Sequence, residues 1–477
     1  MRRTKIIATI GPASDDARTL KGMIGAGLDV ARLGLAHEDL ETHLDRFHRI
    51  REVAAELQRP VGILVDLPGP KVRAGTTPDQ GVDLVEGATI RVAPGTEGSS
   101  AEVITVDYPD LLADVHMGDH LAFGDGAVVV EAVDRGADSL EVRVLHGGLL
   151  KGRPGVHIPA DRLRITAPTP EDLRFLDAFI EVGVDMVALS FVRSAHDVRR
   201  IGTEPHPRGP LVVAKVETRA AVENLDAIIE ASGAVMVARG DLGAECPLEE
   251  LPHLQKRIIH RCIALGRPAI TATQMLESMV AAPSPTRAEA SDVANAVFDG
   301  TSALMLSGET AIGADPVNVV ETMARIARRA DQEFDYEAWA ISVAELQAEG
   351  RTDQVDATVT NAMSMAAWRA ATETRAAAII CLSRTGFTVR SIARFRPEAK
   401  ILGYSTDERT VRQLTMSWGA SPFLLEPLAT TEDRITWAIE HAVSSGEVRK
   451  GDLVAVLHGS VFYPEQATDT LRLVQIT

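Results

Sequence analysis

The sequence predicts an α/β protein built as a (β/α)8 barrel, with a small β-barrel lid domain inserted into it and a C-terminal α/β sheet domain after it. Eight short β-rich apolar runs alternate with helix-like stretches, one long interval separates the third run from the fourth, and the alternation resumes after the eighth. Eight βα units are the number that closes a parallel barrel, whose functional side chains stand at the strand ends and in the loops that follow.

The barrel strands are predicted where β-branched and apolar residues cluster. The eight runs are residues 5–10, 29–35, 61–67, 186–192, 211–217, 234–239, 269–274 and 303–307. Residues 68–185 separate the third run from the fourth, which is far too long for one βα connection. We therefore predict a barrel formed by residues 1–70 and 167–338, interrupted by a domain of residues 71–166.

The inserted segment is rich in Val, Gly and Asp, with short alternating runs at residues 89–92, 127–130 and 140–144. This pattern is typical of a small antiparallel β domain. Residues 339–477 are predicted to form a separate α/β sheet domain, because the βα alternation returns there. Its apolar runs are residues 376–382, 400–404, 422–425, 453–457 and 471–476.

The composition argues against several classes of function. A formal net charge of −18 disfavours a nucleic-acid partner or an anionic membrane surface, since both require an excess of Lys and Arg on one face. The cysteines Cys246, Cys262 and Cys381 share no close spacing, so neither a disulfide framework nor a zinc cluster is indicated. The N-terminus lacks the apolar region of a signal peptide. These features predict a cytoplasmic protein.

Charged residues stand where the fifth and sixth predicted strands end. Period-two alternation places Lys215 and Glu217 on one face at the barrel rim, and Asp241 follows the sixth strand directly after Gly240. Two carboxylates without nearby Cys or His are hard oxygen ligands suited to Mg²⁺ or Mn²⁺. A lysine beside such a metal could neutralise a transferring phosphoryl group. The alternative interpretation is a Lys–Glu ion pair that only closes the barrel rim.

Longer motifs surround these residues. They are Thr-Lys-Ile-Ile-Ala-Thr-Ile-Gly-Pro-Ala-Ser at 4–14, Ala-Leu-Ser-Phe-Val-Arg at 188–193, Lys-Val-Glu at 215–217, Met-Val-Ala-Arg-Gly-Asp-Leu-Gly at 236–243, Thr-Ala-Thr-Gln-Met-Leu-Glu-Ser-Met at 271–279, Pro-Thr-Arg-Ala-Glu-Ala-Ser-Asp-Val-Ala-Asn-Ala-Val at 285–297 and Met-Leu-Ser-Gly-Glu-Thr-Ala at 305–311. In this order they resemble the pyruvate kinase family over nearly the whole chain. That family's barrel, mobile β lid and C-terminal regulatory domain agree with the predicted layout.

The resemblance implies that phosphoenolpyruvate and ADP are the substrates, that Mg²⁺ or Mn²⁺ is the cofactor, and that the chain assembles as a homotetramer. By this resemblance Glu217 and Asp241 would bind the metal, and Lys215 would stabilise the transferring phosphoryl group. Arg32 and Ser190 would lie at the substrate phosphate.

The resemblance also places Thr273 near the carbon that is protonated as enolpyruvate becomes pyruvate. The start of the helix after the sixth strand favours a binding site for the substrate carboxylate near Thr273. Backbone amides of Arg239, Gly240 and Asp241 begin the following helix, where free N–H groups and the helix dipole favour an anion.

The nucleotide side departs from the family pattern. By resemblance His37 and Arg73 lie at the nucleotide, and Arg73 also acts in catalysis and pairs with Asp125 to close the lid. Pro154 stands where the family has a lysine at the nucleotide phosphates. Arg153 or Lys151, from the same strand, would compensate for that lysine.

The monovalent-cation side departs as well. Gly34 and Ala36 stand where potassium-dependent members have asparagine and serine, and Leu67 stands where they have threonine. Lys71 replaces their glutamate, as in potassium-independent members of the family. Its ammonium beside Asp66 could replace the charge of the ion. The sequence therefore predicts that K⁺ is not required.

A possible effector loop follows the first strand of the C-terminal domain. Ser383, Arg384, Thr385 and Thr388 align with the family's sugar-phosphate loop, between a strand and a helix. The start of a helix favours anions through its free amides and its dipole. An ordinary helix cap explains the same residues equally well.

Three functional hypotheses stay open on the sequence. The first is a pyruvate kinase that uses Lys71 in place of K⁺. The second is a divergent paralogue that keeps the enolpyruvate site but uses another phosphoryl partner or a 2-oxo acid, as Gly34, Ala36 and Pro154 suggest. It predicts binding of oxalate with metal but little affinity for ADP. The third is a non-catalytic metabolite sensor, which the joint presence of Lys215 and Glu217 with Asp241 and Thr273 disfavours.

Overall fold

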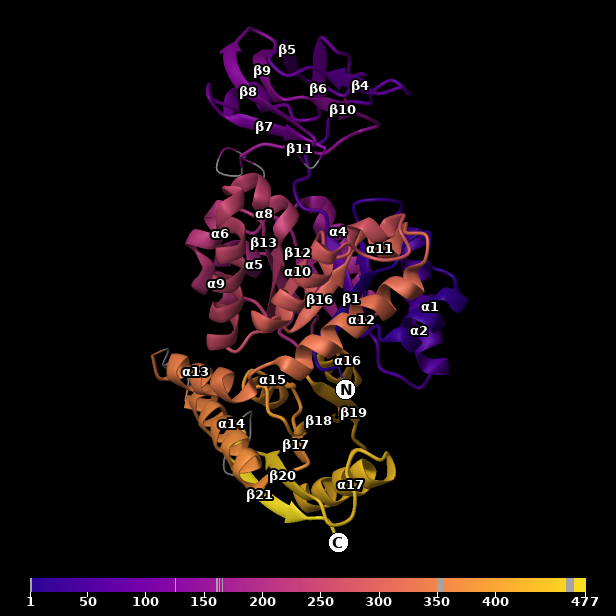
Figure 1. Ribbon diagram of the computed structural model, residues 1–477, viewed down its shortest axis with the longest axis vertical. Coiled ribbons are helices and arrows are strands. Elements are labelled where there is room, and N and C mark those ends of the chain that lie inside the picture. Colours follow the sequence, from indigo (N-terminus) through magenta and orange to yellow (C-terminus); the bar gives the residue numbers. More distant parts are fainter. Residues whose placement is uncertain are drawn as a thin grey trace.

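The computed structural model describes residues 2–124, 126–159, 162, 164, 166–349, 355–459 and 467–477. Figure 1 shows three bodies along the long axis of the molecule, with a β-rich domain at the top, the barrel in the middle and a sheet domain at the bottom. The predicted order of barrel, inserted lid and C-terminal domain is confirmed as an architecture, while the residue boundaries between the domains stay predictions.

Eight parallel strands close the barrel in the order β1-β16-β15-β14-β13-β12-β3-β2. They are β1 (Lys5–Thr9), β2 (Val30–Gly34), β3 (Gly62–Leu67), β12 (Met186–Leu189), β13 (Leu211–Val216), β14 (Ala234–Ala238), β15 (Ala269–Ala272) and β16 (Ala303–Leu306). Each lies within its predicted run. The strands β12 and β15 end early because Phe191, Thr273 and Gln274 adopt positive φ angles of 55°, 67° and 52°, which no strand contains.

The barrel interior is filled rather than hollow. Side chains that point inward from the strands, among them Ile7, Leu64, Met236 and Ile270, are fully buried and form one cluster. A larger apolar layer, which includes Val65 on the outward face of β3, separates the strands from the surrounding helices. This packing makes the barrel a rigid base whose strand ends carry the functional groups.

Four of the helices around the barrel begin at a side-chain N-cap of Asp or Thr. Asp16, Asp39, Thr169 and Thr286 each accept backbone N–H groups of the first turn, and Thr286 forms a capping box with Glu289. The helices are α1 (Ala17–Ala26), α2 (Leu40–Glu56), α4 (Pro170–Glu181), α5 (Ala195–Arg199), α6 (Arg219–Glu223), α7 (Leu225–Ala231), α8 (Arg239–Glu245), α9 (Leu251–Ala264), α10 (Arg287–Phe298), α11 (Gly308–Ala311) and α12 (Pro316–Glu333).

The inserted domain is a six-stranded sheet, in the order β11-β7-β8-β9-β5-β6, beside a two-stranded sheet of β10 and β4. Bridges from Arg73 to Gly155 and from Ala74 to Val106 connect the two edges of the larger sheet, so it closes on itself as predicted. The strands are β4 (Val82–Leu84), β5 (Thr89–Pro94), β6 (Val103–Val106), β7 (His120–Phe123), β8 (Val128–Arg135), β9 (Leu140–His146), β10 (Gly148–Leu150) and β11 (Val156–His157), with the short helix α3 (Leu111–Asp114).

One strand pair of the lid differs from the antiparallel prediction. The strands β5 and β6 pair in parallel, with Arg91 opposite Val103. Residues 95–102 return the chain to the beginning of β5 before β6 starts, so both strands run in the same direction. The returning loop has no apolar alternation. The sequence pattern therefore could not predict the direction in which β6 pairs with β5.

The C-terminal domain has a five-stranded sheet in the order β19-β18-β17-β20-β21, parallel except for the last pair. Its strands are β17 (Ala378–Leu382), β18 (Lys400–Ser405), β19 (Ala420–Leu424), β20 (Leu453–His458) and β21 (Thr470–Gln475). Its helices are α13 (Tyr336–Glu349), α14 (Val355–Thr374), α15 (Phe387–Ala393), α16 (Glu408–Leu414) and α17 (Thr431–Ser444). Within the described residues, no helix combines the length and the apolar character that crossing a membrane requires.

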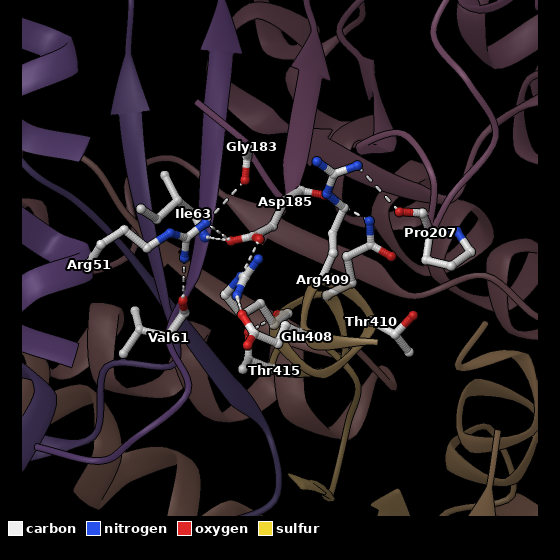
Figure 2. A network of polar contacts seen from close by, with 12 residues as sticks. Arg51, Val61, Ile63, Gly183, Asp185, Pro207, Glu408, Arg409, Thr410 and Thr415 are labelled. Atoms are coloured by element: carbon white, nitrogen blue, oxygen red, sulfur yellow. Dashed lines mark hydrogen bonds and ion pairs between the residues drawn. The ribbon is translucent and has the colours of Figure 1, made fainter. Parts of the chain in front are cut away.

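A buried carboxylate is one of the links between the C-terminal domain and the base of the barrel (Figure 2). Asp185, directly before β12, is fully buried. Its Oδ2 accepts hydrogen bonds from Arg51 Nη2 at 2.6 Å and from the Ile63 amide in β3 at 2.8 Å. Its Oδ1 accepts one at 2.7 Å from Nε of Arg412 in α16. Asp185 therefore connects three elements: the start of β12, the N-terminal end of β3 and the helix α16.

We predict that Asp185→Asn lowers the free energy of unfolding by about 2 to 4 kcal/mol, because two partly buried guanidinium groups lose their shared counter-charge. Urea unfolding followed by tryptophan fluorescence measures the change. Asp226→Asn is the matched control, since it breaks an exposed pair with Arg261 and should cost less than about 1 kcal/mol. Equal losses in the two variants would contradict the role given to Asp185.

Candidate active site

A cavity of about 150 Å³ opens at the C-terminal ends of the barrel strands. Its lining comes from strand ends and from the loops that follow them, which is where a barrel of this type carries its functional groups. The predicted site residues that line it are Arg32, Asp66, Lys71, Ser190, Lys215, Glu217, Asp241 and Thr273.

Lys215 is the centre of this site. Its Nζ lies 2.8 Å from Glu217 Oε1 and 3.2 Å from Asp66 Oδ1, and it donates a hydrogen bond of 2.7 Å to Ser190 Oγ. Burial alone would lower the pKa of Lys215, but the carboxylates of Asp66 and Glu217 outweigh it, so the pKa is raised. Lys215 therefore carries a permanent positive charge in a nearly closed pocket.

Two carboxylates face this cavity from neighbouring strands. Glu217 is 1% exposed, and its Oε2 accepts a 2.7 Å hydrogen bond from the Phe191 amide. Burial raises the pKa of Glu217 to about 7; Lys215 opposes this shift, and the charge of Asp241 adds to it. Asp241 lies in the first turn of α8. A divalent cation bound between Glu217 and Asp241 would neutralise the repulsion between these two carboxylates.

The donor set fits a hard divalent metal with an incomplete protein shell. Within the described part of the chain no group of three His, Cys, Asp or Glu side chains could enclose an ion. Glu217 and Asp241 would then supply two oxygen ligands, and substrate oxygens and water would supply the others, as Mg²⁺ prefers.

Asp66 at the end of β3 anchors two cations at once. Besides Lys215, it accepts a 2.8 Å hydrogen bond from Arg32 Nε, and Arg32 Nη1 donates at 2.8 Å to Thr9 Oγ1. Burial would raise the pKa of Asp66, but Lys215 and Arg32 lower it below its ordinary value. The guanidinium of Arg32 is thus fixed at the cavity wall, where it can meet an anionic group.

The turn after β15 carries backbone strain at the site. Thr273 is β-branched yet has a φ of 67°, and its Oγ1 accepts a 2.8 Å hydrogen bond from the Gly240 amide. The Gly240 amide, one of three predicted to hold a substrate carboxylate, is therefore bonded to Thr273. The guanidinium of Arg239 does not line the cavity. It donates to the Thr273 carbonyl at 2.6 Å and pairs with Asp292 at 2.7 Å.

Two carboxylates that the sequence did not single out support this site. Asp292 holds Arg239, and Arg239 in turn holds the strained turn at Thr273. Glu309 is buried and accepts hydrogen bonds from the amides of Ser307 at 2.6 Å and Leu276 at 3.1 Å. Asp292 and Glu309 lie inside quoted motifs, but no pattern in one sequence tells a supporting carboxylate from a reacting one.

The predicted nucleotide residues lie apart from the cavity, between β2 and the lid. Arg73 donates to the Ala36 carbonyl at 3.3 Å and to the Arg153 carbonyl at 3.4 Å. The guanidinium of Arg153 lies 3.2 Å from the exposed Asp107 of the lid. Partial desolvation, then the charges of Arg73 and Lys71, lower the pKa of His37. Asp125, the predicted partner of Arg73, lies outside the described residues.

The predicted cation surrogate Lys71 lines the cavity but forms no ion pair with any described residue. Asp66 instead pairs with Arg32 and Lys215. A Cβ at Gly34 would lie 3.5 Å from the Arg32 guanidinium, which is an ordinary van der Waals contact, so Arg32 alone does not require a glycine there. Lys71 therefore adds an uncompensated positive charge beside the site.

The predicted effector loop borders a second cavity of about 490 Å³ in the C-terminal domain. Ser383 and Arg384 line this cavity together with Arg434. Thr385 accepts a hydrogen bond of 3.4 Å from the Phe387 amide, and Thr388 is buried with its Oγ1 2.5 Å from that of Thr468. Two of the four predicted residues thus face open space, while the other two serve the local structure.

The closed barrel and the charged cavity at its strand ends define the class of protein: a (β/α)8-barrel enzyme with a lysine, an arginine and a pair of acids in its site. Family models give the particular family. The model described as pyruvate kinase, barrel domain, matches residues 1–320, and that described as pyruvate kinase, alpha/beta domain, matches residues 361–474. The chain belongs to the pyruvate kinase family.

Curated relatives agree over the full length of the chain. A pyruvate kinase of Geobacillus stearothermophilus is 40% identical and one of Bacillus licheniformis 38%, each match covering 100% of this chain and 80% of the relative. A pyruvate kinase of Clostridium acetobutylicum is 36% identical, with 100% of this chain and 99% of the relative covered.

Proposed function

We propose that this chain transfers the phosphoryl group of phosphoenolpyruvate to ADP, giving pyruvate and ATP. The observation that carries the proposal is Lys215 Nζ, held among Asp66, Glu217 and Ser190 at the barrel rim in a chain of this family. In the reaction the bond between phosphorus and the enol oxygen breaks, and a bond from phosphorus to a β-phosphate oxygen of ADP forms. The enolate then takes a proton at its methylene carbon.

The chain's own side chains supply position and charge for this transfer. Arg32, fixed by Asp66 and Thr9, binds the substrate phosphate, and Lys215 neutralises charge on the transferring group. Thr273 stands beside the methylene carbon. Glu217 and Asp241 would hold Mg²⁺ or Mn²⁺, which when bound supplies further neutralisation of the phosphate and enolate oxygens.

A lactate dehydrogenase-coupled assay with phosphoenolpyruvate, ADP and Mg²⁺ tests this function. We expect turnover by the native chain, and a loss of about 10² to 10³-fold in kcat for Lys215→Met, because one preorganised cation is removed from the transition state. Lys256→Met is the control, since Lys256 pairs with Asp299 outside the cavity. Absence of turnover in the native chain, or equal activity of the two variants, would overturn the proposal.

A second candidate function is transfer to a different phosphoryl acceptor. The pairing of Arg153 with Asp107, and Pro154 in place of the family lysine, favour it, since both leave few cations for nucleotide phosphates. The two candidates differ in ADP affinity. Calorimetric titration with ADP in the presence of metal and oxalate, an enolate mimic, separates them: binding of both supports the first, and binding of oxalate alone supports the second.

We also propose that Lys71 replaces a monovalent cation. Lys71 lines the same cavity as Lys215, while Gly34, Ala36 and Leu67 offer no side-chain oxygen at the positions that would coordinate K⁺. A tethered ammonium can supply the charge of the missing ion without its coordination.

When tetramethylammonium replaces K⁺ at constant ionic strength, kcat/KM for phosphoenolpyruvate should stay within about twofold of its value in K⁺, because Lys71 supplies the charge. Lys71→Met should lower it about 10- to 100-fold, and K⁺ should not restore it. Lys21→Met, which removes an exposed surface lysine paired with Glu56, is the control. Tenfold activation of the native chain by K⁺ would exclude the surrogate role.

Two further proposals rest on the family resemblance. We propose that the chain works in the cytoplasm, where thiols stay reduced, and its three cysteines form no disulfide with one another. We also propose that it assembles as a homotetramer, and sedimentation at several protein concentrations measures this directly; a monomer throughout would contradict it.

The C-terminal cavity supports a proposed effector site for a phosphorylated sugar. Arg384 and Arg434 supply two cations to one open space beside the loop that contains Ser383. Titration of a sugar bisphosphate should lower the half-saturating phosphoenolpyruvate concentration about 3- to 10-fold, and Arg434→Gln should remove the shift while preserving kcat. An unchanged half-saturation in the native chain would remove the proposal.

A further inference from the structure

Positive backbone angles gather at the catalytic end of the barrel. Seven described residues other than glycine have a positive φ, a conformation that costs free energy for a residue with a Cβ. Three of them, Gln58, Arg375 and Arg396, follow the ends of helices α2, α14 and α15, where a left-handed residue commonly ends a helix. The other four follow barrel strands at the end that carries the cavity: Glu38, Phe191, Thr273 and Gln274.

Glu38 is the member of this second group whose conformation the catalytic site does not explain. Phe191 donates its amide to the predicted metal ligand Glu217, and Thr273 and Gln274 form the strained turn after β15. Glu38 lies in the loop after β2, has a φ of 65°, and does not line the cavity. Strained backbone persists only where surrounding contacts fix it, so the contacts of Glu38 indicate what its conformation serves.

A buried arginine of α2 holds the side chain of Glu38. Arg46 is 3% exposed, and its Nη2 donates to Glu38 Oε1 at 2.9 Å while its Nη1 donates to Oε2. This two-point contact matches the planar guanidinium to the carboxylate. Nε of Arg46 also donates at 3.1 Å to Asp15, between β1 and α1, which limits how the guanidinium can turn. The hydrogen bonds from Arg46 lower the pKa of Glu38, so this carboxylate stays ionised at neutral pH.

The backbone just before Glu38 is held as well. The Ala36 carbonyl accepts a hydrogen bond at 3.3 Å from Nη2 of Arg73, where the chain enters the lid. The His37 carbonyl accepts one at 2.6 Å from Nε2 of His43, which is 2% exposed in α2. The loop is therefore held by α2 on one side and by the lid on the other.

This loop carries groups of the proposed nucleotide side. Leu35 and Ala36 line the catalytic cavity. Partial burial, then the charges of Arg73 and Lys71, lower the pKa of His37, so this ring stands near a cation of the lid and a cation of the cavity wall. The loop after β2 therefore connects the cavity to the lid.

We propose that Glu38 and Arg46 are positioning residues for the nucleoside diphosphate, because their ion pair holds the loop after β2 in its strained conformation. The fixed loop presents the His37 ring and keeps the Ala36 carbonyl on Arg73, at the side of the site where the phosphoryl acceptor binds. Both side chains act through the loop and not by touching the reacting atoms. This inference rests on the proposed transfer to ADP.

The phosphoenolpyruvate side is fixed independently of this ion pair. Arg32 lies within β2 and bonds Asp66 and Thr9, and Lys215 lies within β13 and bonds Ser190. Loss of the ion pair should therefore weaken the binding of one substrate and not of the other. A general loss of folding would weaken both.

Glu38→Gly tests the proposal, because glycine adopts a φ of 65° without steric cost. The variant removes the ion pair while it relieves the strain. In the lactate dehydrogenase-coupled assay the KM for ADP should rise about tenfold, while kcat and the KM for phosphoenolpyruvate stay within about twofold of their native values. If Glu38 served only the local structure, the glycine variant would keep the native KM for ADP, and this result would overturn the inference.

Gln58→Gly is the matched control, since Gln58 has a φ of 48° at the other end of α2, and both KM values should stay native. Glu38→Gln preserves the size and one acceptor oxygen of the side chain, so its KM for ADP should lie between those of the native chain and Glu38→Gly. If the glycine variant does not fold, a native KM for ADP in Glu38→Gln overturns the inference.

Calorimetric titration of the full chain with ADP, in the presence of Mg²⁺ and oxalate, measures nucleotide affinity without turnover. The Kd should rise about tenfold in Glu38→Gly and stay native in Gln58→Gly. A native chain that neither binds nor turns over ADP would overturn the proposed function together with this inference. Native binding with an equal Kd in Glu38→Gly would overturn this inference alone.

Discussion

The structure depends most on the ionic contacts of Asp66. This buried carboxylate at the end of β3 holds Arg32 from β2 on one side and Lys215 from β13 on the other. Because β13, β12, β3 and β2 are neighbours in the closed barrel, a single side chain fixes two cations that lie on strands far apart in the sequence. Buried like charges would otherwise repel each other, so the site requires Asp66 to stay ionised, and the lowered pKa of Asp66 indicates that it does.

The strands that carry this network are held at their other ends too. Asp185 bonds the Ile63 amide of β3 from its place before β12, and Arg412 connects it to the C-terminal domain. The strands β3 and β12 therefore run between two buried carboxylates, Asp66 above and Asp185 below. At their upper ends these two strands meet at the site, where Ser190 Oγ donates to the Leu67 carbonyl.

The sequence predicted the fold well because the barrel depends on local pattern. Each of the eight apolar runs contains its strand, and the long interval after residue 67 located the inserted domain. The β5–β6 pair was wrong in direction, since the loop between these strands has no periodicity. The pattern of alternation gives strands and their order along the chain, but the direction of pairing depends on tertiary packing.

The site was predictable where motif and strand end coincide, and much less so elsewhere. Lys215, Glu217 and Ser190 lie together at the strand ends where the sequence predicted them, but Asp66, which was predicted beside Lys71, pairs with Lys215 and Arg32. The predicted carboxylate site at the backbone amides of Arg239, Gly240 and Asp241 stays a prediction, and the structure adds that the Arg239 guanidinium holds the turn at Thr273. Positive φ at Thr273 is set by surrounding contacts, and a threonine gives no local signal of it.

The two ends of the barrel compensate buried positive charge in different ways. At the catalytic end, carboxylates from neighbouring strands accept from Lys215 and Arg32, so the cations there are held by the chain itself. At the other end, Arg390 donates to the His206 ring and to the Thr385 carbonyl, and Arg267 donates to the Ser232 carbonyl beside the charge of Glu230. The chain thus holds its buried guanidinium groups with backbone carbonyls and a ring nitrogen at the base of the barrel, and it reserves closely paired carboxylates for the end where phosphoryl chemistry needs fixed charges.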